Sequence, residues 1–300
     1  GETEAIMQIG VSTYSFHELV KSGKMTQFDV VAKTAEMGFS FIEIAGLDVP
    51  AGENAKDYAA RLRAECEKFG LEIGNYTIGA DFLNGSGGDW KAEVRRLHGE
   101  VHVAAILGAP GMRHDVTGGR RKGSGAPLSQ APAESFESVL PVLAQACRSL
   151  TEYAADKGVR TMSENHGYFC QDSERVEKLI AATNHPNYGA LVDMGNFLCV
   201  DENPALAVGR MAPYAFHLHV KDFHFKNGQE PNPGEGWFPT RGCNLLRGAI
   251  IGHGIVPVRQ CLQIMRQAGY DGRVSIEFEG MEDPLLGIRI GLQNLKNYLQ

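Results

Sequence analysis

The sequence has no apolar run long enough to cross a bilayer, which takes about 18 residues. Its longest largely apolar runs, such as residues 101–107, have the length of a strand or of part of a buried helix. An excess of positive charge is also missing, because 29 Lys and Arg stand against 36 Asp and Glu, for a net charge of −7. A general nucleic-acid-binding protein would normally be basic. We therefore expect neither a membrane nor a nucleic acid as a partner.

Cysteine pairs at redox or metal-binding spacing are absent as well. The six cysteines include no C-x-x-C pair and are loosely spaced over the 300 residues. A chain of this length can bury a large core without disulfide bonds, so we interpret these residues as reduced structural thiols. Residues 1–6 show no signal-peptide pattern, although a signal peptide removed earlier stays an alternative. The expected location is the cytoplasm.

Short apolar segments alternate with longer helical patterns along the chain. Residues 54–69, for example, place their apolar side chains on one helical face, start at the capping residue Asn54 and are followed by Gly70. Strands that alternate with helices form parallel sheets with right-handed crossovers. Eight such units predict a (β/α)8 TIM barrel in one domain, residues 1–300. The predicted strands are 7–12, 41–44, 71–76, 111–114, 159–164, 188–193, 215–220 and 274–278.

A doubly wound open sheet is the alternative architecture. It would normally carry a Gly-rich phosphate-binding turn after its first strand, and residues 10–14 (GVSTY) do not have that pattern. Two segments interrupt the alternation and are predicted as loop insertions. Residues 118–132 are rich in Gly, Ser and Pro and form either a surface loop or a lid. Residues 221–251 contain Trp237, which we expect to cover a substrate or to contact a second subunit of a homo-oligomer.

Polar side chains end the last four predicted strands. Glu164, Asp193 and Glu277 each stand at the C-terminal end of a strand, and His217 and His219 end the strand between the last two acids. In a barrel these ends face one mouth, where active sites form. Three carboxylates there would repel one another unless a cation neutralised them. Oxygen ligands with one imidazole suit Mn²⁺, Mg²⁺, Co²⁺ or Zn²⁺.

At these positions the sequence resembles the sugar isomerase/epimerase superfamily, whose members have a xylose isomerase-like barrel of the AP endonuclease 2 type. The resemblance covers nearly the whole chain and rests on an ordered set of motifs, each of which is weak alone. The motifs are IGVSTYSF near the start, ENH at 164–166, LVDMGN at 191–196, HLHVKD at 217–222, GHGIVP at 252–257 and GYDGRVSIEFEG at 269–280.

The resemblance implies that Glu164, Asp193, His219 and Glu277 bind one divalent metal ion, with Mn²⁺ the first expectation. The second histidine of the H-x-H pair is the ligand in the family, which favours His219 over His217. The resemblance also implies a metal-dependent isomerase or epimerase that acts on a keto sugar or cyclitol through a metal-stabilised enediolate. Glu164 and Glu277 would exchange the proton on opposite faces of the substrate.

One position departs from the pattern of many epimerases. Asn196 stands where they carry histidine, and it is a poor base. His166 stands where many of them have no histidine, so we expect it to act as a catalytic acid or base. This difference leaves room for a lyase, such as an inosose dehydratase or a deglycosidase of 3-keto sugars. Substrate contacts are expected from Glu43, Tyr76 (or Asn75), His114 (or Arg113), Asn196, His217, Lys221, Trp237 and His253.

Three other interpretations of these residues are possible from the sequence. An ion-pair network of the carboxylates with Lys221 and arginines would leave no metal site. Endonuclease IV-type phosphoesterases share the barrel but carry histidines on the early strands, which here end in Glu43, Asn75 and Tyr76. A non-catalytic subunit would be favoured by loss of the four ligands, and all four are present. We therefore expect an enzyme with a small-molecule sugar or cyclitol substrate.

Overall fold

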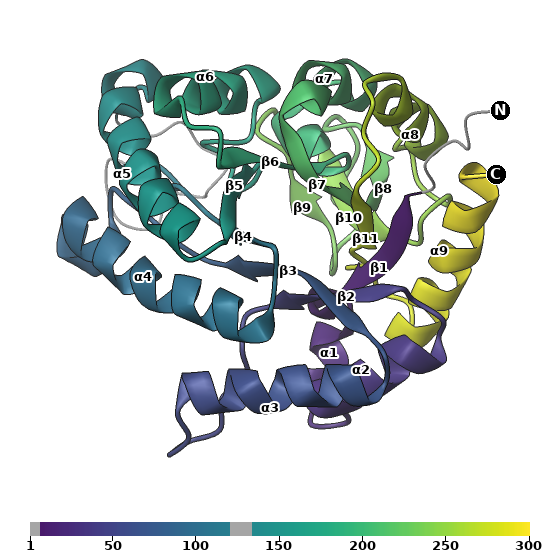
Figure 1. Cartoon of the computed structure of the whole chain (residues 1–300). Coiled ribbons are helices and arrows are strands. Elements are labelled where there is room, and N and C mark those ends of the chain that lie inside the picture. Colours follow the sequence, from purple (N-terminus) through teal and green to yellow (C-terminus); the bar gives the residue numbers. More distant parts are fainter. Residues whose placement is uncertain (1–6, 121–133) are drawn as a thin grey trace, which may run out of the picture.

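The computed structural model describes residues 7–120 and 134–300. Its centre is a closed barrel of parallel strands in the order β1-β11-β7-β6-β5-β4-β3-β2, and helices surround it (Figure 1). The predicted (β/α)8 barrel is therefore confirmed. The barrel strands are β1 (Gln8–Ser12), β2 (Phe41–Ala45), β3 (Glu72–Ile78), β4 (Gly111–His114), β5 (Arg160–Glu164), β6 (Tyr188–Asp193), β7 (Ala215–Val220) and β11 (Arg273–Ile276).

Helices α2, α3, α4, α5, α7 and α9 begin at side chains that satisfy their first backbone N–H groups. Thr26 and Asp29 form a reciprocal capping box at the start of α2, and Asn54 accepts from two backbone N–H groups at the start of α3. In the described residues, no helix combines the length and the apolar character that crossing a membrane needs. The helices are α1 (His17–Lys21), α2 (Gln27–Glu36), α3 (Ala55–Lys68), α4 (Trp90–Leu107), α5 (Phe136–Asp156), α6 (Ser173–Thr183), α7 (Pro204–Met211), α8 (Val258–Gln267) and α9 (Pro284–Tyr298), with short 3₁₀ turns η1 (Thr13–Phe16), η2 (Gly85–Gly88), η3 (Asn196–Val200) and η4 (Ala212–Tyr214).

An aromatic ring fills the barrel near the N-terminal ends of its strands. The ring of Phe41 on β2 lies where a Cβ atom at Gly10 or Gly74 would come within 2.5 Å of it, so the neighbouring strands need glycine there. The Arg273 guanidinium lies over this ring, 5.8 Å from its centroid, and Glu43, Asn75 and His217 are buried above it. The upper half of the barrel interior is therefore polar.

The segment 221–251 is partly folded, so its prediction as a loop was wrong. β8 (Asp222–Lys226), β9 (Phe238–Pro239) and β10 (Leu245–Ala249) form an antiparallel sheet in the order β8-β10-β9. Phe223 and Leu246 are fully buried in a small second core with Cys199, and this packing between distant segments stabilises the sheet. Of the other predicted insertion, 118–132, residues 121–132 lie outside the described residues.

Candidate metal centre

The four predicted ligands meet at the C-terminal mouth of the barrel. Glu164 ends β5, Asp193 ends β6, His219 lies near the end of β7, and Glu277 directly follows β11. One ligand atom from each lies within 4.8 Å of the others. His219 Nδ1 is 3.5 Å from Asp193 Oδ2, 3.5 Å from Glu277 Oε2 and 3.9 Å from Glu164 Oε2. The closed barrel thus brings together side chains from strands that are distant in sequence.

Three of these side chains carry a buried atom without a hydrogen-bond partner. The atoms are Glu164 Oε1, Asp193 Oδ2 and His219 Nδ1. Leaving one buried polar atom unpaired costs about 1–3 kcal/mol. Arg113 and Lys221 offset this cost for the two carboxylate oxygens as ion partners, whereas His219 Nδ1 has no cationic or hydrogen-bond partner among the described residues, which indicates a missing partner there. Two carboxylate oxygens and one imidazole nitrogen are donors that Mn²⁺, Mg²⁺, Co²⁺ and Zn²⁺ accept. The residues present therefore fit a divalent cation.

A buried ammonium group also lies in this cluster. Lys221 Nζ is 2.6 Å from Glu277 Oε1, 3.3 Å from Asp193 Oδ2 and 3.7 Å from Glu279 Oε1. Burial alone would lower the pKa of Lys221, but the nearby Asp193 and Glu277 carboxylates raise it well above its ordinary value. The ion-pair network that the sequence left open is therefore present in part. It meets Asp193 Oδ2 only as an ion pair at 3.3 Å and does not reach His219 Nδ1, which lies within 4 Å of three carboxylates, so it does not replace a cation.

A second cationic side chain links the cluster to the rim of the mouth. Arg113 Nε is 3.1 Å from Glu164 Oε1, and Arg113 Nη1 is 3.3 Å from Asp115 Oδ1. The same Asp115 oxygen lies 2.8 Å from His166 Nδ1. Burial raises the pKa of Glu164 to about 7, and Arg113 opposes this rise. Asp115 raises the pKa of His166 to about 9, although burial works in the other direction.

Asn196 connects the two sides of the cluster. Its amide nitrogen donates to Glu164 Oε2 at 3.0 Å, and its amide oxygen accepts from Lys221 Nζ at 3.0 Å. Its backbone N–H donates to Asp193 Oδ1 at 2.9 Å. Asn196 therefore orients two carboxylates and an ammonium group, a role that needs an amide and no proton transfer.

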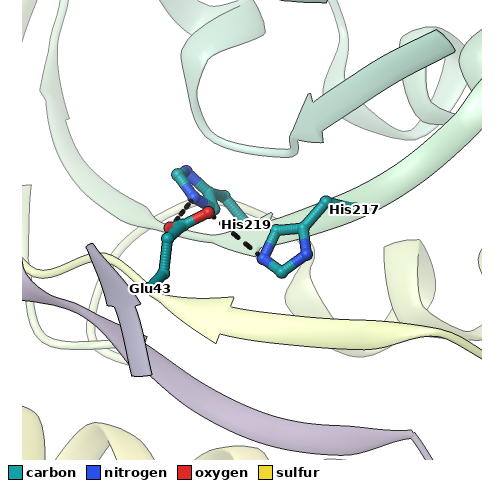
Figure 2. Close-up of side chains that lie close together, drawn as sticks. All are labelled: Glu43, His217 and His219. Atoms are coloured by element: carbon teal, nitrogen blue, oxygen red, sulfur yellow. Dashed lines mark hydrogen bonds and ion pairs between the residues drawn. The ribbon is translucent and has the colours of Figure 1, made fainter. Parts of the chain in front are cut away.

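Glu43 and His217, which were expected to contact the substrate, lie deeper in the barrel, behind His219. Glu43 Oε1 is 2.5 Å from His219 Nε2, and Glu43 Oε2 is 3.3 Å from His217 Nε2 (Figure 2). Asn75 Nδ2 donates to Glu43 Oε2 at 2.8 Å. Burial alone would raise the pKa of Glu43, but the two histidines and Asn75 hold it at about 2.

Tyr76 and His114 point away from the mouth. The Tyr76 hydroxyl donates to Glu100 on α4 at 2.5 Å, and the fully buried ring of His114 packs between the barrel and its helices. Side chains alternate between the two faces of a strand. The preceding residues, Asn75 and Arg113, consequently face the barrel interior. They were the alternatives to Tyr76 and His114 in the sequence analysis.

Trp237 and His253 also lie apart from the four ligands. The Trp237 ring centroid is 6.0 Å from the charged groups of Lys226 and Arg247, beside β9. His253 is exposed in the turn between β10 and α8. The carboxylate of Asp222 accepts hydrogen bonds from three backbone N–H groups of this turn and fixes its conformation. These contacts explain the conformation of the turn without a role for His253 in substrate binding.

Sequence reasoning missed two acidic residues of the site, Asp115 and Glu279. Glu279 lies two positions after Glu277, so both carboxylates point to the same side, where Lys221 meets them. The alternation of the motif EFE at 277–279 is a signal that would have found it. Asp115 follows the end of β4, two positions after the inward-facing Arg113, and the same count would have placed it at the mouth.

Residues 31–298 match the family model described as a xylose isomerase-like TIM barrel. The chain belongs to this family. Its sequence is similar to an inosose dehydratase of Clostridium botulinum (strain Alaska E43 / Type E3), with 26% identity over 144 residues, 48% of this chain and 47% of that protein. The chain thus spans about half the length of the curated relatives it matches.

Two solved structures have a similar barrel. A xylose isomerase-like TIM barrel protein from Mycobacterium smegmatis in complex with magnesium superimposes with a TM-score of 0.71 at 17% identity, covering 98% of each chain. The 3-keto-D-glucoside 4-epimerase YcjR from E. coli superimposes with a TM-score of 0.69 at 16% identity, covering 97% of this chain and 99% of that one. At this level of identity the likeness shows the fold alone.

Proposed function

We propose that this protein is a divalent-cation-dependent enzyme that removes a proton next to the carbonyl group of a keto sugar or cyclitol. The observation that carries the proposal is the convergence of ligand atoms from Glu164, Asp193, His219 and Glu277 within 4.8 Å of one another, around a buried His219 Nδ1 that has no hydrogen-bond partner among the described residues. When bound there, a cation such as Mn²⁺ would supply Lewis-acid stabilisation of the negative charge that develops on the carbonyl oxygen. The similarity to an inosose dehydratase supports a polyhydroxylated ketone as the substrate class.

Glu164 is the proposed base. Its carboxylate ends β5 at the mouth beside the proposed cation, and without the cation, burial raises its pKa to about 7. A carboxylate next to a cation-bound carbonyl is well placed to remove the acidified proton. Arg113 and Asn196 contact its two oxygens and fix its direction. Glu277 is the second carboxylate that can exchange a proton, and Lys221 holds it at 2.6 Å.

His166 favours elimination over epimerisation. Its side chain is 46% exposed at the mouth, and Asp115 engages Nδ1, so Nε2 is the nitrogen available to a bound molecule. Elimination needs an acid that protonates the departing hydroxyl group, whereas epimerisation returns the proton to the same carbon. We therefore propose a dehydratase. An epimerase is the second candidate, because Glu164 and Glu277 both lie within 4 Å of His219 and offer two carboxylates for one carbon.

Solvent isotope exchange tests the proposal. The Mn²⁺-loaded protein is incubated in D₂O with a panel of an inosose, 3-keto glucosides and ketohexoses, and the products are followed by NMR and mass spectrometry. A dehydratase yields a product lighter by one water, and an epimerase yields an inverted carbon that carries deuterium. Glu164→Gln is expected to abolish both the dehydration and the epimerisation. Absence of exchange with every compound would count against both candidates, and cleavage of a DNA duplex with an abasic site would favour a phosphoesterase.

A further inference from the structure

The interior of the barrel behind the four ligands is polar, whereas apolar side chains usually fill a TIM barrel. Glu43 on β2, Asn75 on β3 and His217 on β7 are all at most 2% exposed. Figure 2 shows Glu43 in contact with both His217 and His219, which come from the same strand. Burying an ionised carboxylate is costly unless its oxygens are hydrogen-bonded, so this arrangement calls for a specific role.

Two roles are compatible with the positions of these side chains. Glu43, His217 and His219 each offer a ligand atom within 4.8 Å of the others, as a second cation site would require. The hydrogen bonds argue against that role. Glu43 Oε1 pairs with His219 Nε2, Glu43 Oε2 accepts from Asn75, and neither oxygen is among the unpaired buried atoms. The unpaired nitrogen of His219 is Nδ1, which faces the other cluster.

We propose that Glu43 is a positioning residue for the metal ligand His219. Its carboxylate holds the proton of His219 on Nε2, so that Nδ1 presents its lone pair to the cation bound with Glu164, Asp193 and Glu277. A carboxylate accepts hydrogen bonds and donates none when ionised, so a bond of 2.5 Å to Nε2 selects the Nε2–H tautomer. The inference rests on the proposed function only in that it needs a cation at this site.

The packing around Glu43 keeps its carboxylate in place. His217 Nε2 lies 3.3 Å from Glu43 Oε2, and the ring of Phe41 meets the His217 ring edge-on at a centroid distance of 5.8 Å. Phe41 is itself fixed, since it fills the space left by Gly10 and Gly74. The carboxylate thus rests on a rigid base, and partners of this kind commonly orient a metal-binding histidine and raise its basicity.

The first test is the cation affinity of Glu43→Gln. Mn²⁺ affinity is measured by competition with a chelator, on protein shown to be folded by circular dichroism. We expect a 10- to 100-fold loss, the size typical for removal of such a partner. Ser275→Ala is the matched control: it removes the 2.7 Å hydrogen bond to His217 in the same interior and leaves the Glu43–His219 contact intact. The control is expected to keep the wild-type affinity, and a wild-type affinity in folded Glu43→Gln would overturn the proposal.

The second test uses the unaltered protein and does not depend on the folding of a variant. Nitrogen-15 NMR of the histidine side chains with Mg²⁺ bound reports which nitrogen of His219 carries the proton. We expect the proton on Nε2; a proton on Nδ1 would overturn the proposal. Binding of two cations per chain would assign Glu43 to a second metal site and would also overturn it. Failure to turn over any keto sugar would sink the proposed function and leave these two measurements unaffected.

Discussion

The ammonium nitrogen of Lys221 lies 2.6 Å from Oε1 of Glu277, one of the four predicted metal ligands. The same nitrogen is 3.3 Å from Oδ2 of Asp193, a second ligand. A buried positive charge therefore shares two carboxylates with the proposed cation. Because like charges repel, Lys221 is expected to weaken cation binding while it stabilises the protein without the cation.

Lys221→Met is expected to tighten Mn²⁺ binding and to destabilise the cation-free protein. The affinity should rise about tenfold, which corresponds to roughly 1.4 kcal/mol. Stability without the cation should fall by about 3–5 kcal/mol, because removing one partner leaves buried carboxylates uncompensated. Chelator competition and denaturant unfolding measure the two effects. Lys226→Met, on the outer sheet, is the control and should change neither; weaker Mn²⁺ binding in Lys221→Met would show that the lysine chiefly orients the ligands.

Metal content tests the ligand set directly. The wild-type protein loaded with Mn²⁺ and desalted should retain one equivalent, and Glu277→Gln should retain far less, since an amide is a weaker ligand than a carboxylate. Thermal unfolding should move to higher temperature with added Mn²⁺ in the wild-type protein only, by mass action. Glu282→Gln, outside the site on the same segment, is the control. Equal, near-zero metal in wild type and Glu277→Gln would remove the metal centre from the proposal.

The convergence of the four predicted ligands could be inferred from the sequence, whereas the depth of Glu43 could not. Glu164, Asp193 and Glu277 could be found because a strand followed by a helix marks its own C-terminal end, and all such ends in a barrel face one mouth. Glu43 is the middle residue of β2, two positions after the inward-facing Phe41, so alternation turns it inward but does not give its depth in the barrel. Beside it the pairing of β2 with β3 shifts register, and the extra residue, Gly74, lies on β3. A one-residue shift changes which side chains face inward.

The same register shift explains why Tyr76, and not Asn75, was predicted to face the site. Counting alternation from the sequence assumes regular pairing, and the pattern of β3 gives no sign of the irregularity that turns Asn75 inward. The sheet formed by β8, β9 and β10 was missed for another reason. Its strands depend on packing of Phe223 and Leu246 against Cys199, a contact between segments that sequence patterns do not reveal.

His166→Ala should separate proton removal from loss of the hydroxyl group. If His166 protonates the departing group, the variant should lose about 10²- to 10⁴-fold in dehydration rate. Exchange of deuterium from solvent into recovered substrate should continue, because Glu164 is intact. Measuring both rates on one sample in D₂O gives the comparison, and His253→Ala, an exposed histidine outside the cluster, is the control. Wild-type dehydration by His166→Ala would leave His166 only as a partner of Asp115.

The ionisation of Glu93 on α4 is expected to make the unfolding free energy depend on pH. Its buried carboxylate accepts from Arg96 Nε at 2.7 Å, from the backbone N–H of Asp81 at 2.9 Å and from the hydroxyl of Ser86 at 2.9 Å. Burial acts to raise the pKa of Glu93, but these hydrogen bonds outweigh it and lower the pKa below its usual value. A depressed pKa means that the ionised form stabilises the folded state, and this contribution is present above the pKa of the unfolded chain.

Glu93→Gln should therefore lose about 1–3 kcal/mol of unfolding free energy at pH 7, because the amide replaces charge-assisted hydrogen bonds. The difference from wild type should shrink below about pH 4.3, the ordinary value for glutamate, as the wild-type carboxyl takes up a proton. Urea unfolding at pH 7 and at several lower values measures this. Glu67→Gln, which breaks an exposed ion pair with Arg63, is the control and should cost at most about 1 kcal/mol. The contradicting outcome is a stability difference that stays constant from pH 7 to the lowest pH at which the protein folds. That result would show that the charge of Glu93 does not stabilise the segment between β3 and α4, which contains Asp81 and Ser86.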